Sequence, residues 1–322
     1  MKNLTWQNPE QLFVAQELIN KVKSKCCGIK DIYYIGVVLS FLGLTSCSND
    51  DFTEAPKSAR ETPMTFDVIH PSQTRATATD FENGDKIGVY IAKADMPLEI
   101  GGNTLNNEQL TLTSGKWIPS QNLFWDEGSY NAYAYYPYMN VTSTEDQPVS
   151  VATDQSTAKT KGTLCGYEAS DLLYAKTSNV AASTSPVNLN FKHIMSKLTI
   201  RLVKGEDFEG DMPTDAEIFI HNTVPTATFD ISAGIVTRDI KGKKATIKAR
   251  QESDFQFGAI IVPQRLDNRV PLVEVIMKGV SYLYESKFLF KPGVDHLVNL
   301  VITNNPEQVK IEVGGEVENW QY

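Results

Sequence analysis

The sequence predicts an all-β protein. From residue 64 onward the chain breaks into short runs in which apolar and polar side chains alternate, and glycine, proline or asparagine bounds most of these runs. Almost no stretch keeps a helical period over three turns. A Ser/Thr-rich segment ends near residue 185, and strand candidates are dense after it. We therefore expect two β-sandwich domains in tandem, residues 64–185 and 186–322.

The first element in the chain is an export segment. An uncharged apolar run, residues 32–44, ends in Leu44-Thr45-Ser46-Cys47, where a bacterial signal peptidase would cut before a cysteine that receives diacylglycerol. A membrane-spanning helix needs about 20 apolar residues, so this run is too short for one. We interpret residues 1–46 as a lipoprotein signal peptide with an unusually long n-region, and Cys47 as the lipidated residue. A buried helix with a chance cysteine is the alternative, which the polar tract after Cys47 disfavours.

Residues 47–63 are polar and poor in apolar side chains, so we interpret them as a flexible tether between lipid and domain. Order is expected to begin at Met64. Apolar and polar residues alternate there, which predicts a first strand over residues 64–69 that Pro71 and its neighbours end.

The remainder of the first half predicts further strands separated by two loops, residues 141–163 and 178–186. Residues 131–138 alternate aromatic with small side chains, which favours a strand with an aromatic face packed in the core; a carbohydrate-stacking platform is the alternative. The strand candidates of this half are residues 86–91, 110–113, 117–119, 131–138 and 171–176.

The second half is richer in valine, isoleucine and phenylalanine, as expected for a sandwich core. No exact repeat relates it to the first half. Its strand candidates are residues 187–191, 198–202, 217–220, 245–249, 257–262, 272–277, 282–290 and 297–302.

Composition limits the classes of partner. The net charge is −9, and the first 46 residues hold five lysines against three acidic residues, so the exported part is more acidic still. An acidic protein does not suit nucleic acid, which requires clustered lysine and arginine, so we expect protein or glycan partners. After Cys47 the sequence has only one cysteine, Cys165. Because Cys47 is expected to carry lipid, no intramolecular disulfide can form in the exported part.

The sequence offers no constellation for catalysis, so we predict no enzymatic activity, no cofactor and no metal. No serine lies in a nucleophile motif, Cys165 has no basic neighbour, and Asp126 with Glu127 is interpreted as a charged turn. An envelope hydrolase with two carboxylates across a cleft is a distant alternative. His70, His193, His221 and His296 stand alone, without metal-ligand spacing. His193 and His296 lie in or beside strand candidates and are interpreted as ordinary residues at a sheet edge.

Several runs, in this order, resemble the fimbrillin family of Bacteroidales, the fimbrial subunits and related surface lipoproteins. Each run is a weak match alone, and their order makes the resemblance more specific. They are QTRA (73–76), FENGDKIGVY (81–90), YYPY (135–138), DQS (154–156), DLLYA (171–175), FKHIMSKL (191–198) and Trp320.

The resemblance implies two transthyretin-like sandwich domains, export as a lipoprotein to the outer-membrane surface, and a later cut after an arginine. Arg75 occupies that place, and Ala76 would become the new first residue. The cut would remove the lipid, the tether and the first strand together. A strand donated by another fimbrial subunit would then fill the groove, which gives a head-to-tail homo- or hetero-polymer.

The resemblance leaves the position in the fimbrium open. Family stalk subunits tend to donate a C-terminal segment, and here residues 309–313 and 316–320 are the candidates. If they are core strands of the second domain, the protein would accept a strand without giving one, as a tip or accessory subunit. The alternative function is a surface lipoprotein that binds glycan or host protein without polymerising, through the aromatics Trp117, Trp125 and Tyr138.

Overall fold

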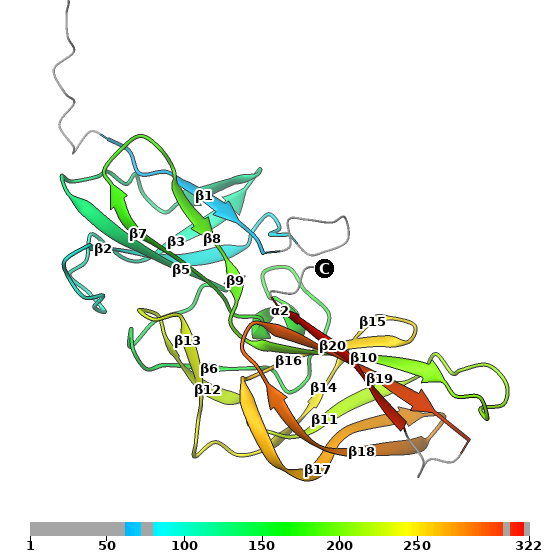
Figure 1. Cartoon of the computed structure of the whole chain (residues 1–322). Helices are drawn as coiled ribbons and strands as arrows, with labels where there is room; N and C mark the ends of the chain where they lie inside the picture. Colours follow the sequence, from blue (N-terminus) through cyan, green and yellow to red (C-terminus); the bar gives the residue numbers. More distant parts are fainter. Residues whose placement is uncertain (1–61, 72–79, 305–309, 319–322) are drawn as a thin grey trace, which may run out of the picture. The chain divides into compact units, whose positions relative to one another are not determined.

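The computed structural model describes residues 62–71 and 80–304, and the backbone of 310–318. Within this part of the chain, twenty strands and one short helix form, which confirms the all-β prediction (Figure 1). The predicted signal peptide, most of the tether and both residues of the predicted cut lie outside it. No helix in the described ranges is long and apolar enough to cross a membrane.

A six-stranded antiparallel sheet forms the main layer of the first half, and each of the five strand candidates between residues 86 and 176 overlaps one of its strands. Its order is β4-β3-β2-β5-β7-β9. The bounds are β2 Lys86–Lys93, β3 Leu105–Thr113, β4 Lys116–Pro119, β5 Ser129–Tyr136, β7 Leu173–Ala181 and β9 Lys192–His193.

Two further strands, β1 (Phe66–Ile69) and β8 (Val187–Asn190), pair in parallel with each other and lie side by side in Figure 1. Their apolar side chains share one core cluster with the six-stranded sheet. Val187 and Leu189 of β8 are buried in the same cluster as Ile87 and Val89 of β2, and Phe66 and Val68 of β1 pack onto that cluster.

The aromatic strand β5 confirms the core interpretation. Tyr135 is fully buried, Tyr133 and Tyr136 are nearly so, and the alternating alanines Ala132 and Ala134 are buried as well. The small residues leave room for the rings of neighbouring strands, because a sheet face alternates its side chains.

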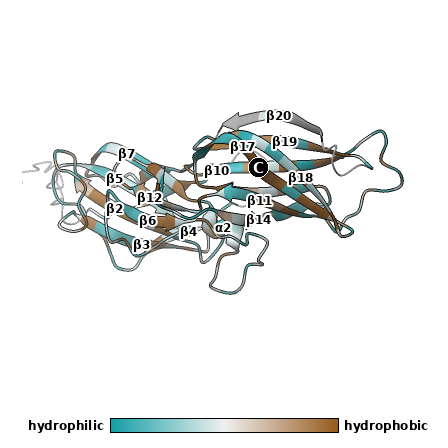
Figure 2. Ribbon diagram, turned by 90° about the horizontal axis from the view of Figure 1, so that it is seen from below, coloured by the Kyte–Doolittle hydropathy of each residue, from teal (hydrophilic) through white to brown (hydrophobic). Residues whose placement is uncertain are grey.

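The second half contains a five-stranded and a four-stranded sheet around a second core cluster, which includes Leu198, Ile218 and Val275. Figure 2 shows hydrophobic and hydrophilic segments mixed along these strands. In the order β15-β16-β10-β19-β20, only β10 and β19 pair in parallel. The bounds are β10 Ser196–Lys204, β15 Arg250–Ser253, β16 Gln256–Ile261, β19 Val294–Ile302 and β20 Lys310–Glu318, and in the four-stranded sheet β11 Glu217–Thr223, β14 Ala245–Lys248, β17 Gln264–Met277 and β18 Val280–Phe290.

The segment 141–163 differs from the predicted surface loop. It contains β6 (Gln147–Ser150), which pairs with β12 (Thr226–Asp230) in a three-stranded sheet completed by β13 (Ile235–Arg238). A polar strand of four residues is stabilised by a partner far away in the sequence, so its local pattern does not reveal it. The helix α2 (Gly166–Ser170) follows, with the Cys165 sulfur accepting a hydrogen bond from the N–H of Glu168.

Sheet pairing also bears on the predicted division near residue 185. The strands β8 and β9 follow that boundary in sequence, yet β8 pairs with β1 and β9 pairs with β7. After that boundary, the chain enters the five-stranded and four-stranded sheets only from β10 onward.

Candidate functional site

The first strand is the part of the described chain that the predicted cut would release, and β8 is its only strand partner there. Phe66 lies beside Val187 and Val68 lies beside Leu189. At the ends of the pair, the N–H of Val187 donates to the carbonyl of Thr65 (2.8 Å), and the N–H of Phe191 donates to that of Ile69 (3.0 Å). Removing β1 would leave these N–H groups of the β8 segment without their acceptors.

The residues just before β1 bind a second piece of backbone. The N–H of Met64 donates to the carbonyl of Leu123 (2.9 Å), and the N–H of Trp125 donates to the carbonyl of Thr62 (2.9 Å). Pro63 and Phe124 form the bridge between these two bonds. The segment before β1 is thus bonded to residues 123–125, and β1 itself to β8.

The side chains of this segment cover part of the first-half core. Met64 is 5% exposed and belongs to the core cluster, while Phe66 and Val68 pack against it from β1. Beside them on β8, Val187 and Leu189 are buried. Loss of residues 62–71 would therefore open an apolar groove edged by backbone groups, and each unsatisfied group costs about 1–3 kcal/mol.

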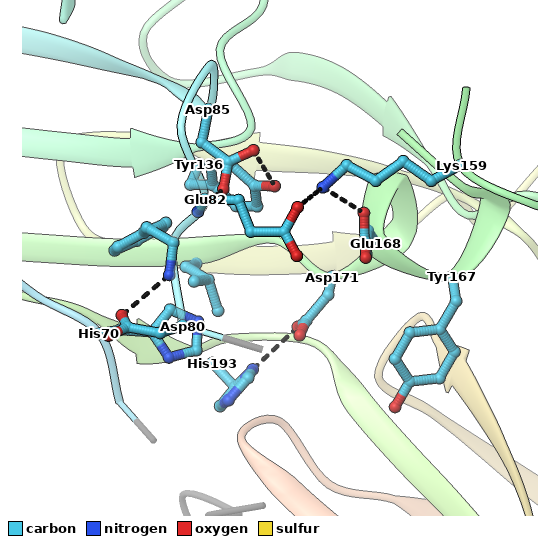
Figure 3. Close-up of a pocket in the computed structure, with 12 residues that line it drawn as sticks. His70, Asp80, Glu82, Asp85, Tyr136, Lys159, Tyr167, Glu168, Asp171 and His193 are labelled. Atoms are coloured by element: carbon cyan, nitrogen blue, oxygen red, sulfur yellow. Dashed lines mark hydrogen bonds and ion pairs between the residues drawn. The ribbon is translucent and has the colours of Figure 1, made fainter. Parts of the chain in front are cut away.

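A small pocket lies at the end of β1, and Figure 3 shows the side chains that line it. The buried ring of His70 meets the edge of Phe81 with centroids 4.7 Å apart, and His193 is hydrogen-bonded through Nδ1 to Asp171 (2.9 Å). Burial lowers the pKa of His70 from 6.5 to about 4; the nearby His193 lowers it further, and Asp171 and Asp80 oppose the shift. His70 is thus held neutral in the folded protein at neutral pH.

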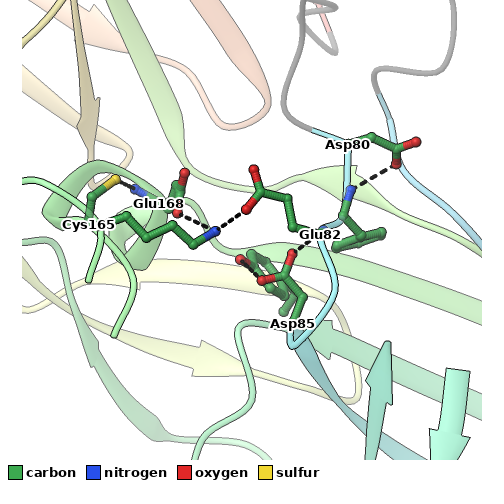
Figure 4. A network of polar contacts seen from close by, with 8 residues as sticks. Asp80, Glu82, Asp85, Cys165 and Glu168 are labelled. Atoms are coloured by element: carbon green, nitrogen blue, oxygen red, sulfur yellow. Dashed lines mark hydrogen bonds and ion pairs between the residues drawn. The ribbon is translucent and has the colours of Figure 1, made fainter. Parts of the chain in front are cut away.

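Lys159 lines this pocket and joins two segments (Figure 3), and its partners Glu82 and Glu168 are labelled in Figure 4. Its Nζ lies 2.8 Å from Glu82 Oε2 and 3.2 Å from Glu168 Oε2, so it connects the turn before β2 with helix α2. Asp85 accepts a hydrogen bond from the N–H of Glu82 (2.8 Å), and burial raises the pKa of Asp85. The pocket offers about 40 Å³, whereas small-molecule sites measure about 300–1,000 Å³. Its role is consistent with holding the end of β1 in place.

The predicted processing and lipidation residues, Cys47, Arg75 and Ala76, lie outside the described residues. In sequence, Arg75 falls after β1 and before β2. A cut there would separate β1 from every later strand. His70 precedes the position of the cut and Phe81 follows it, and both line the same pocket.

The three aromatics predicted to face a ligand behave differently. Trp125 is 1% exposed, and its ring lies tilted against that of Tyr130 with centroids 5.0 Å apart, which corrects its prediction: it belongs to the first-half core cluster. Trp117 is half-buried, with its ring 5.1 Å from that of Phe81. Tyr138 is also half-buried, and its N–H donates to the carbonyl of Lys86. The structure does not gather these rings into one platform.

The other histidines also have polar partners, as expected for His193 and His296. The Nε2 of His296 accepts from the N–H of Lys291 (3.1 Å), and His221 lies 2.9 Å from Glu274. Across the described ranges, no three histidine, cysteine, aspartate or glutamate side chains gather as metal ligands.

Sequence reasoning missed two parts of this site. It assigned residues 187–191 to the second domain, although they supply the strand on which β1 lies. It also left His70 and Phe81 unconnected, because the order of residues carries no signal that their rings meet. Phe81 itself was named only as the first residue of a run, 81–90, that resembles the fimbrillin family.

Comparison with known proteins gives a family and a fold. The model of the fimbrillin-like family matches residues 74–320, which is more than half of the chain. No curated protein matches the chain. Among solved structures, a candidate cell adhesion protein of Bacteroides ovatus is similar, with TM-score 0.63 and 19% identity over 81% of this chain and 97% of that one. A candidate cell adhesion protein of Bacteroides uniformis has TM-score 0.61 and 19% identity over 80% and 99% of the two chains.

At these identities the two solved structures support the fold alone, and the family rests on the sequence match. That match begins one residue before Arg75 and extends almost to the C-terminus. The chain therefore belongs to the fimbrillin-like family.

Proposed function

We propose that this protein is a structural or accessory subunit of cell-surface fimbriae, exported as a lipoprotein on Cys47 and assembled by strand exchange after a cut behind Arg75 removes β1. Family membership supports the coarse role of fimbrial subunit or adhesin. The placement of β1 is the single observation that carries the finer proposal. It is the strand nearest the N-terminus among the described residues, it pairs with β8 alone there, and it precedes Arg75.

The groove left by β1 suits an incoming strand. It would present the N–H groups of Val187 and Phe191 and the apolar surface around Leu189. An extended segment with apolar residues at alternate positions would restore both the backbone bonds and the side-chain packing, which is recognition by β-augmentation. The donor and the groove are different surfaces, so contacts between like subunits would extend head to tail.

The C-terminal strand supports the accessory form of the proposal. β20 pairs antiparallel with β19, from Val294 opposite Glu318 to Val301 opposite Lys310. A segment already paired within its own sheet must leave that sheet before it can be donated. We therefore infer that this subunit accepts a strand more readily than it donates one, as a tip or accessory subunit does. No enzymatic activity is part of the proposal.

The test is the N-terminus of the protein in material sheared from native cells, compared with the membrane fraction. We expect the sheared, high-mass material to begin at Ala76, and Arg75→Gln to remain lipidated and unassembled. Arg60→Gln is the matched control, because a cut after Arg60 would leave β1 in place. Lipidated Cys47 in every fraction, with no assembly, would overturn the proposal.

A second experiment tests the groove directly. After purified protein is cut behind Arg75, the first-strand segment should leave only when a replacement strand is supplied. A synthetic peptide of residues 62–74 fits the same groove, so it should compete with the strand of another subunit and reduce assembly. A control peptide with Phe66 and Val68 changed to aspartate should not compete, because its apolar side chains no longer fit the core. Equal effects of both peptides would contradict strand exchange.

The non-polymerising, glycan-binding alternative has less support. It relied on Trp125 as a ligand-facing ring, and that ring is buried. Its remaining candidates, Trp117 and Tyr138, are half-buried.

A further inference from the structure

The second half of the protein encloses a lysine. Lys197 on β10 is 2% exposed, and its Nζ lies 2.9 Å from Glu252 Oε1 and 3.8 Å from Asp295 Oδ2. Lysine is seldom fully buried, and burying ions from water costs several kcal/mol each unless their pairing compensates. A lysine enclosed with two carboxylates, outside the site around β1, therefore requires a physical explanation.

Strand register brings the amine and one carboxylate together. β10 and β19 are parallel neighbours, and Lys197 lies directly beside Asp295 in their register. Neighbouring residues at one register position project to the same face of a sheet, so the two side chains meet without any loop having to close. Glu252 reaches the amine from β15, on the other side of β16.

Burial shifts the carboxyl of Asp295 toward its neutral form. Burial raises the pKa of Asp295, although Lys197 and the hydrogen bond from Thr199 oppose the shift. The Thr199 hydroxyl donates to Oδ2 (2.9 Å), and Oδ1 has no hydrogen-bond partner among the described residues. A neutral carboxyl is a better electrophile than a carboxylate, because the attacking amine meets no negative charge.

The surrounding residues make space for the group and limit its access to water. At Gly258, an added Cβ would lie 2.4 Å from Glu252 Oε1 and 3.3 Å from Lys197 Cε, so the absence of a side chain there accommodates the pair. The ring of Tyr167, from helix α2, lies with its centroid 5.9 Å from Lys197 Nζ. The Glu252 side chain is 18% exposed, which leaves it in contact with solvent while Lys197 is not.

We propose that Lys197 and Asp295 become joined by an intramolecular amide bond, with Glu252 as the proton acceptor. Lys197 gives one ammonium proton to Glu252, and the amine lone pair attacks Cγ of the neutral Asp295 carboxyl. The new C–N bond forms and one C–O bond breaks. The amine's second proton goes to the departing hydroxyl, so one water leaves, and the proton on Glu252 passes to solvent. No oxidant, reductant or co-reactant is required.

The closeness of the Lys197 amine to the Asp295 carboxyl favours this step. Intramolecular reactions between groups held about 3–3.5 Å apart reach effective molarities of about 10⁵–10⁸ M. The 3.8 Å between Nζ and Oδ2 places the amine beside the carboxyl, and attack on Cγ requires the two side chains to move closer together. The product replaces a buried ion pair by a neutral amide and ties β10 to β19 in the five-stranded sheet. It would resist separation of these two strands under load, whether or not the subunit assembles through β1.

Whole-protein mass of the exported protein, purified in its folded form, tests the proposal. We expect a mass lower by one water than the mass calculated for the same processed form of the chain, and a branched peptide linking the Lys197 and Asp295 segments after proteolysis. Asp295→Ala and Lys197→Arg should each restore the full mass. Glu252→Gln keeps the shape of the side chain but accepts no proton, and should slow or abolish the loss of water.

Glu217→Gln is the matched control, because Glu217 pairs with Lys248 in a more exposed ion pair and its removal should leave the loss of water unchanged. The mass and the branched peptide of the unsubstituted protein decide the question, so a variant that fails to fold does not affect the conclusion. Full mass together with the absence of a branched peptide would overturn the proposal and leave Lys197 as an ordinary buried ion pair.

Discussion

His70 and His193 lie edge to face, with their ring centroids 6.3 Å apart. This contact joins the residue that follows β1 to the short strand β9, and it places a buried, neutral histidine at the end of the segment that the proposed cut would release. The pKa of His70 is about 4 in the folded protein against 6.5 when exposed, first because of burial and then because of His193.

Acid should loosen the first strand. Above pH 6.5 His70 is neutral in both the folded and the unfolded state, so it adds no pH dependence. Between pH 6.5 and about 4 the unfolded state binds a proton that the folded state does not, and the free energy of unfolding falls by up to about 3 kcal/mol. Urea unfolding of the uncut protein from pH 7 to pH 4 measures this loss.

The variant His70→Gln isolates that contribution. Its free energy of unfolding should depend less on pH in this interval, and the difference from the unsubstituted protein cancels groups such as Asp85 that titrate in both. His221→Gln, on β11 and outside the β1 pocket, is introduced into both proteins as a control. The difference in pH dependence between them should then stay unchanged. If the free energy of unfolding of His70→Gln changes with pH in parallel with that of the unsubstituted protein, His70 is not the source of the pH dependence.

Gly88 should not tolerate alanine, because the ring of Tyr135 lies across it. The two residues are opposite each other on β2 and β5, and an added Cβ would lie 2.4 Å from Tyr135 Cζ. The ring cannot simply turn away, since it is fully buried and its hydroxyl donates to the carbonyl of Met139 (3.0 Å). Overpacking of this kind costs about 1–3 kcal/mol, measurable by urea or thermal unfolding.

Gly101→Ala is the control for Gly88→Ala. Nothing lies within 4 Å of a Cβ added at Gly101, so its effect should stay within about 0.5 kcal/mol. Equal stability of the two variants would show that β2 and β5 separate easily at Tyr135, and would weaken the account of this core.

The strands that could be predicted are those whose own residues carry the pattern. β10, β16 and β19 are apolar on a buried face. The candidates 198–202 and 297–302 fall within β10 and β19, and 257–262 extends one residue beyond β16. β6 and β15 are polar or half-exposed, and only a partner strand makes them strands. A prediction from local alternation has no access to that partner.

The site was predictable only in part for a related reason. Alternation indicated a first strand, and β1 lies within the expected range 64–69. Its parallel pairing with β8 joins residues far apart in sequence, and parallel pairing leaves no turn between the strands as a signal. Trp125 was misjudged because a tryptophan beside charged residues has the same sequence context whether its ring is buried or exposed.

Gln155 should act as a structural residue of the second core. Its side chain is fully buried, its Nε2 donates to the carbonyl of Ile260 (2.7 Å), and its Oε1 accepts from the N–H of Ile260 (2.8 Å). It therefore bonds β16 as a neighbouring strand would. Gln155→Ala leaves both backbone groups unsatisfied, which costs about 1–3 kcal/mol for each group without solvent access.

Gln155→Glu is the informative companion variant, because it keeps the acceptor for the Ile260 N–H and loses the donor to the carbonyl. We expect a loss of stability at neutral pH that diminishes as the new carboxyl is protonated in acid. Gln251→Ala, at an exposed position on β15, should cost little by comparison. Similar unfolding midpoints for Gln155→Ala and Gln251→Ala would refute the role of Gln155.

Trp125 and Trp117 separate a structural role from ligand binding. Trp125→Ala removes a buried ring from the core that also receives Met64, so it should lower the free energy of unfolding by about 3–5 kcal/mol. Trp117→Ala should cost less stability, because the Trp117 ring is half-buried and contacts the ring of Phe81.

Any glycan binding lost in Trp125→Ala should return in Trp125→Phe, which refills the core without restoring the indole. Binding that is lost in both variants, while each remains folded by urea titration, would mean that the indole itself contacts the ligand, and would favour the non-polymerising alternative.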